Sequence, residues 1–174
     1  ELLYNSGIET QELKFEYSDL NAFDMVFFNS KNAVRHFFNQ VNVKDLNLQF
    51  AAFGQATATE ILKYTSEVQF IGMSSDPDVV ANEFNSAYKI SQRILFPCST
   101  KSLKSVSSVL KSNHQIIEVV VYDTIIKPEI NLPEADVYVM TSPSNVQSFS
   151  NSLKKLNNKL IVSIGPSTAQ ALQA

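Results

Sequence analysis

Residues 24–34, DMVFFNSKNAV, decide how this chain folds. After Asp24 the segment is continuously apolar as far as Phe28, which is typical of a strand covered on both faces. Asn29 and Ser30 then interrupt the apolar run, and serine is a favoured residue immediately before a helix. Apolar residues follow at helical spacing from Ala33 to Phe38. The segment therefore predicts a buried strand, a short polar turn and an amphipathic helix.

The same succession recurs along the whole chain. Short runs rich in Val, Ile and Phe alternate with segments of helical periodicity, and this alternation predicts a parallel α/β fold. The predicted strands are Asp24–Phe28, Gln49–Phe53, Val68–Ile71, Arg93–Phe96, Gln115–Val121, Asp136–Met140 and Lys159–Ile164.

An internal repeat underlies this alternation. The segment Phe28–Val34 resembles Met140–Val146, and matching Ser30 to Ser142 gives an offset of 112 positions. Farther along, Phe53–Ala58 resembles Ile164–Ala169, with an offset of 111 positions between the two glycines. Two motifs that recur in the same order at nearly one offset indicate two related α/β halves.

The repeat predicts two flavodoxin-like lobes of parallel sheet flanked by helices. Two extended segments, Glu12–Tyr17 and Val119–Ile126, are expected to pair as a connector. The prediction places one lobe at 14–122, the second at 1–13 plus 127–174, and the connector at 123–126, so that one lobe is inserted in the other. Since the sequence begins and ends within helical patterns, we expect the second lobe to be incomplete. A ligand would then bind in the cleft between lobes, at strand carboxyl ends and helix N-termini.

The composition excludes several classes of protein. Of 174 residues, 44% are hydrophobic and only 4 are glycine, and no glycine-rich nucleotide loop occurs. The net charge of −3 and the absence of a basic stripe argue against nucleic-acid binding. A single cysteine, Cys98, and two histidines argue against a metal site or disulfide. No apolar run is long enough to span a membrane. We therefore expect a cytoplasmic protein without metal or cofactor.

With these motifs in order, the sequence resembles the uroporphyrinogen-III synthase family. The likeness covers essentially the whole chain, and the order of the motifs is more specific than any one of them. The motifs that carry it are Phe28–Val34, Ala52–Ala58, Leu95–Ser99, Val121–Thr124, Thr141–Val146 and Ile164–Ala169.

The resemblance implies a cofactor-free enzyme of tetrapyrrole (haem) biosynthesis. Members of this family close hydroxymethylbilane, a linear tetrapyrrole, to uroporphyrinogen III. They invert the last ring, ring D, through a spiro intermediate and release water. The resemblance also implies a first strand and helix before Glu1 and a last strand and helix after Ala174. We expect a monomer that acts on a small molecule and could receive it from the preceding pathway enzyme.

The resemblance assigns the catalytic role of general acid to Tyr122, since a phenol is protonated at neutral pH and can donate to the departing hydroxyl. The substrate carries eight carboxylates, whereas this chain has only two arginines, Arg35 and Arg93. Backbone N–H groups at helix starts should therefore bind the carboxylates. We expect Ser99 and Thr100 to offer one such start before the next helix. The predicted substrate-binding residues are Ser30, Lys31, Asn32, Gly54, Thr57, Ser99, Thr100, Thr141, Ser142, Ser144, Asn145, Gly165 and Thr168.

Simpler interpretations remain for each of these residues. The serines could be plain helix caps, and Tyr122 could be a packed strand aromatic. His36 is interpreted as a helix-surface residue and Cys98 as a buried small hydrophobe. At the level of function, the alternatives are a non-catalytic two-lobed module that binds a small anionic ligand, and a receiver-like or flavodoxin-like interaction domain. The strand-end turns carry Asn, Ser and Thr rather than an acidic cluster or a flavin phosphate loop, which disfavours the last of these.

Overall fold

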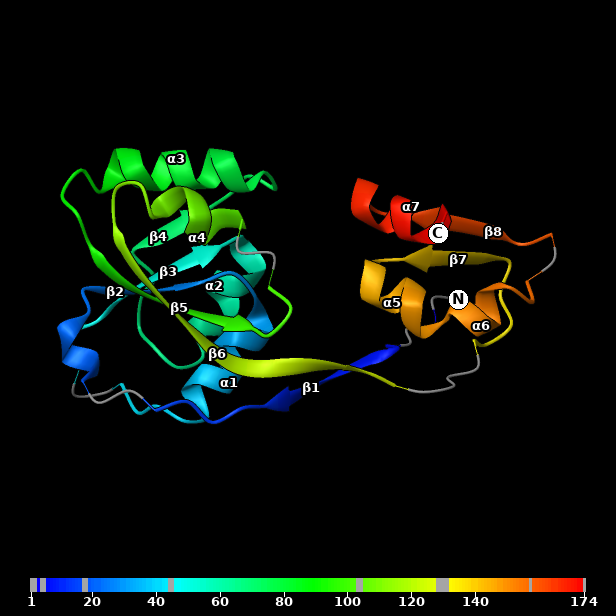
Figure 1. The fold of residues 1–174 in the computed structure, drawn as a ribbon, viewed down its shortest axis with the longest axis horizontal. Helices are drawn as coiled ribbons and strands as arrows, with labels where there is room; N and C mark the ends of the chain where they lie inside the picture. Colours follow the sequence, from blue (N-terminus) through cyan, green and yellow to red (C-terminus); the bar gives the residue numbers. More distant parts are fainter. Residues whose placement is uncertain are drawn as a thin grey trace. The chain divides into compact units, whose positions relative to one another are not determined.

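The computed structural model describes residues 3, 6–16, 19–43, 46–102, 105–127, 132–156 and 158–173. These residues belong to two compact units. The large unit is the continuous segment Glu12–Asp123, and the small unit combines Glu1–Gln11 with Thr124–Ala174. Each unit has its own sheet and its own hydrophobic core, so each is described by itself (Figure 1).

The large unit is built on strands β2 to β6 of a six-stranded sheet, whose order is β1-β6-β5-β2-β3-β4. Strands β2 to β6 run parallel to one another. Strands β2, β3 and β4 were predicted to within two residues, because continuous apolar runs mark strands buried on both faces. Strand β5 runs three residues beyond its predicted end at Phe96, and β6 runs five beyond its predicted end at Val121. The strands are β1 (Ile8–Glu12), β2 (Met25–Phe28), β3 (Gln49–Phe53), β4 (Phe70–Gly72), β5 (Arg93–Ser99) and β6 (Gln115–Ile126).

Helices cover both faces of this sheet (Figure 1). Successive residues of β2 point to opposite faces, as in any strand. Val26 and Phe28 pack with α1 (Lys31–Phe38) and α2 (Gln55–Ile61). On the other face, Met25 and Phe27 pack with α3 (Pro77–Ala87) and α4 (Ser105–Leu110). A short 3₁₀ helix, η1 (Leu20–Ala22), precedes β2.

The strand order reverses between β2 and β5. From β2 the chain proceeds through β3 to β4 on one side, and it then returns to place β5 and β6 on the other side. In doubly wound sheets the helices diverge at such a point, and a crevice opens beyond the carboxyl ends of the two strands. The topology therefore predicts a ligand site at the turns after β2 and β5.

The predicted connector pairing forms, with one of its strands displaced. The Leu13 N–H donates to the Val121 carbonyl at 3.0 Å and the Lys127 N–H to the Gly7 carbonyl at 2.9 Å, so β1 runs antiparallel to β6. The first connecting strand is β1, Ile8–Glu12, and the prediction at Glu12–Tyr17 was wrong by about one strand length, with Tyr17 outside the described residues. The second is part of β6, a single strand of 12 residues.

The small unit contains two parallel strands, β7 (Val137–Met140) and β8 (Leu160–Ser163). Its helices are α5 (Pro143–Ser148), α6 (Ser150–Leu153) and α7 (Pro166–Gln173). Tyr138, Met140, Val146 and Phe149 form its core. The alternate residues of both strands, which are also apolar, are exposed: Val137, Val139, Leu160, Val162 and, just beyond β8, Ile164.

The two units share the predicted repeat at the level of backbone pairing. Phe28 pairs with Ala52 in the large unit, and Met140 pairs with Ser163 in the small unit, which are the offsets of 112 and 111 positions found in the sequence. Ser30 and Ser142 cap the following helices with almost the same φ and ψ, −158° and 154° against −159° and 156°. The repeat is therefore a repeat of structure.

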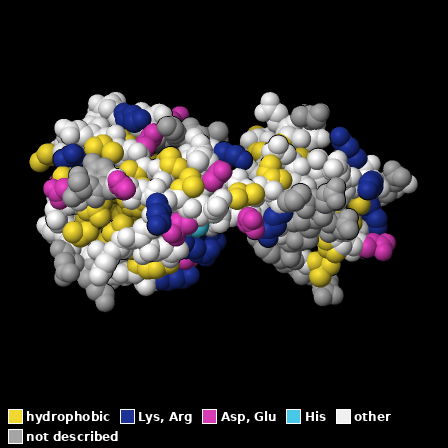
Figure 2. Space-filling model, turned by 60° about the horizontal axis from the view of Figure 1, so that its bottom comes forward, with side chains coloured by type: hydrophobic (Ala, Val, Ile, Leu, Met, Phe, Trp, Pro, Cys, Tyr) yellow, Lys and Arg dark blue, Asp and Glu magenta, His cyan; other side chains and the backbone are white. Residues whose placement is uncertain are grey.

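Among the described residues, no helix is long and apolar enough to cross a membrane. On the face drawn in Figure 2, acidic and basic side chains are interspersed. The described side chains of this face thus form no continuous stripe of one sign.

Candidate functional site

A cavity of about 290 Å³ lies in the large unit at the reversal between β2 and β5. Its walls come from the carboxyl ends of β2, β3 and β5, from Tyr122 within β6, and from the starts of α3 and α4. Serine and asparagine side chains meet three aromatic rings there, so the lining can both form hydrogen bonds and contact a flat ring. The lining residues are Asn29, Ser30, Phe53, Ser75, Pro77, Phe96, Ser99, Ser102, Val106 and Tyr122.

Ser30 links the helix start to the cavity. Its Oγ accepts a hydrogen bond from the Ala33 N–H at 3.2 Å, which caps α1. The same Oγ lies 3.2 Å from the Tyr122 hydroxyl. Ser30 is thus a helix cap, as the simpler interpretation held. It is not only a cap, because its side chain also contacts Tyr122, the residue predicted to be catalytic.

A β-bulge aims Tyr122 at this serine. Cys98 pairs with Val120, but Ser99 pairs with Tyr122, so Val121 is an extra residue in β6. Side chains normally alternate along a strand, whereas Val121 and Tyr122 both pack in the core beneath α1 and α2. Tyr122 is 8% exposed and still lines the cavity. The bulge therefore turns the phenol from the exposed side of Val120 towards α1.

His36 is not the helix-surface residue that the sequence suggested. Its imidazole stacks on the Tyr122 ring, with 5.2 Å between centroids and 19° between planes. The imidazole Nδ1 lies 3.8 Å from a carboxylate oxygen of Glu12, which also accepts a hydrogen bond from the Asn39 side chain at 3.1 Å. A helix residue flanked by Arg35 and Phe37 gave no sign in the sequence of this contact with a distant strand.

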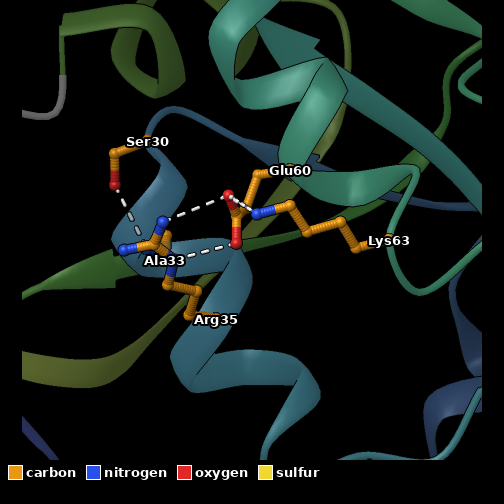
Figure 3. Close-up of polar contacts among 5 residues, drawn as sticks. All are labelled: Ser30, Ala33, Arg35, Glu60 and Lys63. Carbon is orange, nitrogen blue, oxygen red and sulfur yellow. Dashed lines mark hydrogen bonds and ion pairs between the residues drawn. The ribbon is translucent and has the colours of Figure 1, made fainter.

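An ion-pair cluster fixes α1 against α2 (Figure 3). Arg35 donates two hydrogen bonds to the Glu60 carboxylate, at 2.8 and 3.2 Å, and Lys63 adds one at 2.8 Å. Glu60 is buried, but hydrogen bonding from Arg35 outweighs the effect of burial and lowers the pKa of the carboxyl to about 2. The same pair raises the pKa of Arg35. The helix that carries Ser30 and His36 is thereby tied to its neighbour.

Of the other predicted binding residues of the large unit, Ser99 also lines the cavity, whereas Lys31, Asn32, Gly54, Thr57 and Thr100 do not. Lys31 and Asn32 form the first turn of α1, and Thr57 is buried inside α2. Thr100 donates a hydrogen bond to the Asp123 carboxylate. The expectation that Ser99 or Thr100 starts a helix was wrong, because Ser99 ends β5 and α4 begins at Ser105.

Gly54 precedes α2 with a φ of +84°, a conformation that only glycine adopts readily. Its N–H donates to the Gly72 carbonyl at 2.8 Å. Its role in the turn is therefore backbone geometry, and no ligand contact is needed to explain it.

The six predicted residues of the small unit gather at two helix starts. Ser142 caps α5 by accepting from the Asn145 N–H at 3.2 Å, and Asn145 donates to the Thr141 hydroxyl at 3.0 Å. Ser144 lies in the first turn of α5. Gly165 precedes α7, and Thr168 is buried within it.

Several lining residues were missed in the sequence. In the sequence, Ser75 and Pro77 indicate only that a helix begins, and no pattern marks Ser102. Each follows the carboxyl end of a strand in a sheet whose parallel strands end at one edge. That shared edge was the available signal. Among the described residues, no group of three or more His, Cys, Asp or Glu could hold a metal ion.

The fold and the cavity define a doubly wound α/β protein with a hydroxyl-lined site at its switch point. A family model described as uroporphyrinogen-III synthase HemD matches residues 6–174. The chain belongs to the uroporphyrinogen-III synthase family, whose enzymes are hydro-lyases of porphyrin biosynthesis, as the sequence motifs had indicated.

Solved structures with this fold carry the same family name. The chain is similar to uroporphyrinogen-III synthetase from Helicobacter pylori, with 22% identity, a TM-score of 0.68, and 95% of this chain and 79% of that chain covered. It is also similar to a mutant uroporphyrinogen III synthase from the extremely thermophilic bacterium Thermus thermophilus, with 16% identity, a TM-score of 0.60, and coverage of 95% and 76%. These likenesses establish the fold. A comparison with curated proteins found no match.

Proposed function

We propose that this chain converts hydroxymethylbilane to uroporphyrinogen III, with inversion of ring D and loss of water, and that the cavity of the large unit holds the reacting ring. The observation that carries the proposal is the contact of 3.2 Å between the Tyr122 and Ser30 hydroxyls at the cavity wall. It brings a proton donor and a capped helix start to one place at the switch point of the sheet.

In this proposal, Tyr122 is the general acid. The bond from the terminal carbon to its hydroxyl breaks, the phenol proton passes to that hydroxyl, and water leaves. The proton lost from the pyrroles as the ring closes restores the phenol, so the step is neutral overall. A positioned acid of this kind contributes about 10² to the rate, and the remaining selectivity comes from holding the chain in the spiro geometry.

Ser30 supports this acid through the direction of its own hydrogen bonds. Its oxygen accepts from the Ala33 N–H, so its hydroxyl proton is available to the Tyr122 oxygen. The Tyr122 proton can then face the cavity. Negative charge that develops on the phenol oxygen lies beside a serine donor and near the positive end of the α1 dipole, and both stabilise it.

Substrate carboxylates would be bound by backbone N–H groups and hydroxyls, because the chain has few arginines, and Arg35 is already paired with Glu60. The proposed contributors are the starts of α1 and α2 in the large unit and of α5 and α7 in the small unit. The residues at or near these helix starts are Ser30, Lys31, Asn32, Gly54, Thr57, Thr141, Ser142, Ser144, Asn145, Gly165 and Thr168, and Ser99 and Thr100 at the end of β5 are proposed to contribute as well.

We further propose that the two units are the two flavodoxin-like lobes of the enzyme. The boundaries would be 14–122 for one lobe and 1–13 with 127–174 for the other, with 123–126 as connector. The shared repeat of strand pairing and serine cap supports a common origin of the lobes. The proposed enzyme is a monomer without cofactor.

The experiment generates hydroxymethylbilane in situ, adds the protein, and measures the ratio of type III to type I isomer after oxidation. A large excess of type III supports the proposal, since the uncatalysed reaction gives type I. Folded protein that yields type I alone contradicts it. Tetrapyrrole binding without type III formation would instead identify a non-catalytic binding module.

A further inference from the structure

We infer that His36 is a positioning residue for Tyr122, a role that rests on the proposed function of the same site. The imidazole does not line the cavity but lies behind the phenol, against its ring face. It therefore acts on the substrate through Tyr122 and not by contact.

Helix α1 and its capping serine contact Tyr122 at two points. Ser30, at the start of the helix, meets the phenol oxygen at 3.2 Å, and His36 meets the ring at 5.2 Å between centroids. A hydrogen bond at the hydroxyl alone leaves the ring free to move towards the side on which His36 lies. A stacked ring removes this freedom, because the two planes lie within 19° of each other.

The His36 side chain is itself held in place by its neighbours. Its side chain is 13% exposed, and Glu12 approaches its Nδ1 to 3.8 Å from the end of β1. Glu12 is in turn fixed by the Asn39 amide at 3.1 Å. The imidazole is therefore enclosed between a carboxylate and the phenol.

Helix α1 is also fixed as a whole. Arg35 adjoins His36 in the sequence and ties the helix to Glu60 of α2 by two hydrogen bonds. Because the helix is fixed, Ser30 and His36 are held in place, and their contacts hold Tyr122 in place in turn. Loss of the ring at position 36 should thus displace the phenol and leave the cavity wall otherwise in place.

The test compares His36→Leu with His36→Phe in the full chain. His36→Phe keeps a flat ring and His36→Leu does not. We expect His36→Leu to lower kcat for type III formation about tenfold with little change in KM, because misplacement of a reacting group slows chemistry without weakening binding. His36→Phe should restore most of the rate. Tyr64→Leu is the matched control, since it removes another stack of the same unit, on Phe38 at 4.6 Å.

A second readout does not depend on catalysis. In protein labelled with ¹³C-tyrosine, the Tyr122 ring resonance, assigned by its loss in Tyr122→Phe, should shift in His36→Leu and return towards its normal place in His36→Phe. An unshifted resonance overturns the inference, as does an equal loss of rate in His36→Leu, His36→Phe and Tyr64→Leu. If the unsubstituted protein forms no type III isomer, the proposed function fails, and the resonance alone decides whether His36 positions Tyr122.

Discussion

The hydroxyl groups of Ser30 and Tyr122 lie 3.2 Å apart, although 92 positions separate the two residues in the chain. One ends the turn after β2, and the other follows a bulge in β6, two strands away in the sheet. The contact arises because parallel strands end at the same edge and because the bulge redirects the tyrosine. It joins a structural cap to the proposed acid of the reaction.

Replacement of Ser30 and replacement of its counterpart Ser142 should therefore have similar effects on stability but different effects on catalysis. Replacing either serine with alanine removes a cap of the same geometry and should lower the free energy of unfolding by about 1 kcal/mol. Only Ser30→Ala also removes a donor from Tyr122, so it should reduce kcat several-fold, and Ser30→Thr should keep both properties. Denaturant unfolding and the isomer assay measure the two effects. Unchanged stability in both alanine variants would contradict the capping role.

Glu60 should make the large unit sensitive to acid. Its pKa falls from 4.5 to about 2 on folding, chiefly through the Arg35 hydrogen bonds. A carboxyl with a depressed folded pKa contributes stability above its unfolded pKa and loses it as the pH falls towards the folded value. The contribution, on the order of 2–3 kcal/mol at neutral pH, should disappear between about pH 4.5 and pH 2.

Glu60→Gln tests this assignment. The variant should be less stable than the unsubstituted protein at pH 7, and the difference should shrink as the pH falls through that interval. Glu83→Gln, an exposed change on α3, is the control and should leave the pH dependence unaltered. Thermal unfolding at a series of pH values measures both. A constant difference between Glu60→Gln and the unsubstituted protein at all pH values would show that the ion pair is not the source.

The two equivalent glycines of the repeat should respond differently to alanine. Gly54 has a φ of +84°, and an L residue there is strained by about 1–3 kcal/mol. Gly165 does not have a positive φ, and a Cβ at this position would have no other atom within 4 Å. Gly165→Ala should thus change stability by less than about 0.5 kcal/mol. Denaturant unfolding of Gly54→Ala and Gly165→Ala measures the difference. Both variants keep the backbone N–H, so they differ only in backbone strain, and equal losses of stability would contradict this distinction.

Much of the fold could be predicted from local pattern, but the contacts around Tyr122 could not. The apolar runs and the serine turns are repeated, and a repeated pattern identifies strand, cap and helix without knowledge of the whole. The bulge at Val121 leaves no mark in a run of three valines followed by tyrosine. The stack of His36 on Tyr122 depends on that bulge, so it was missed for the same reason. Ser75 and Ser102 join the cavity only through the common edge of the sheet.

Tyr122 is the central residue of the proposed mechanism, and the rate of type III formation by Tyr122→Phe tests its role most directly. The substitution removes the hydroxyl and keeps the ring that packs against His36, so folding should be preserved. We predict a fall in kcat of about 10² and little change in KM. Tyr64→Phe, at a tyrosine that does not line the cavity, should be fully active. An unaltered rate in Tyr122→Phe would contradict the proposed acid and the site built around it.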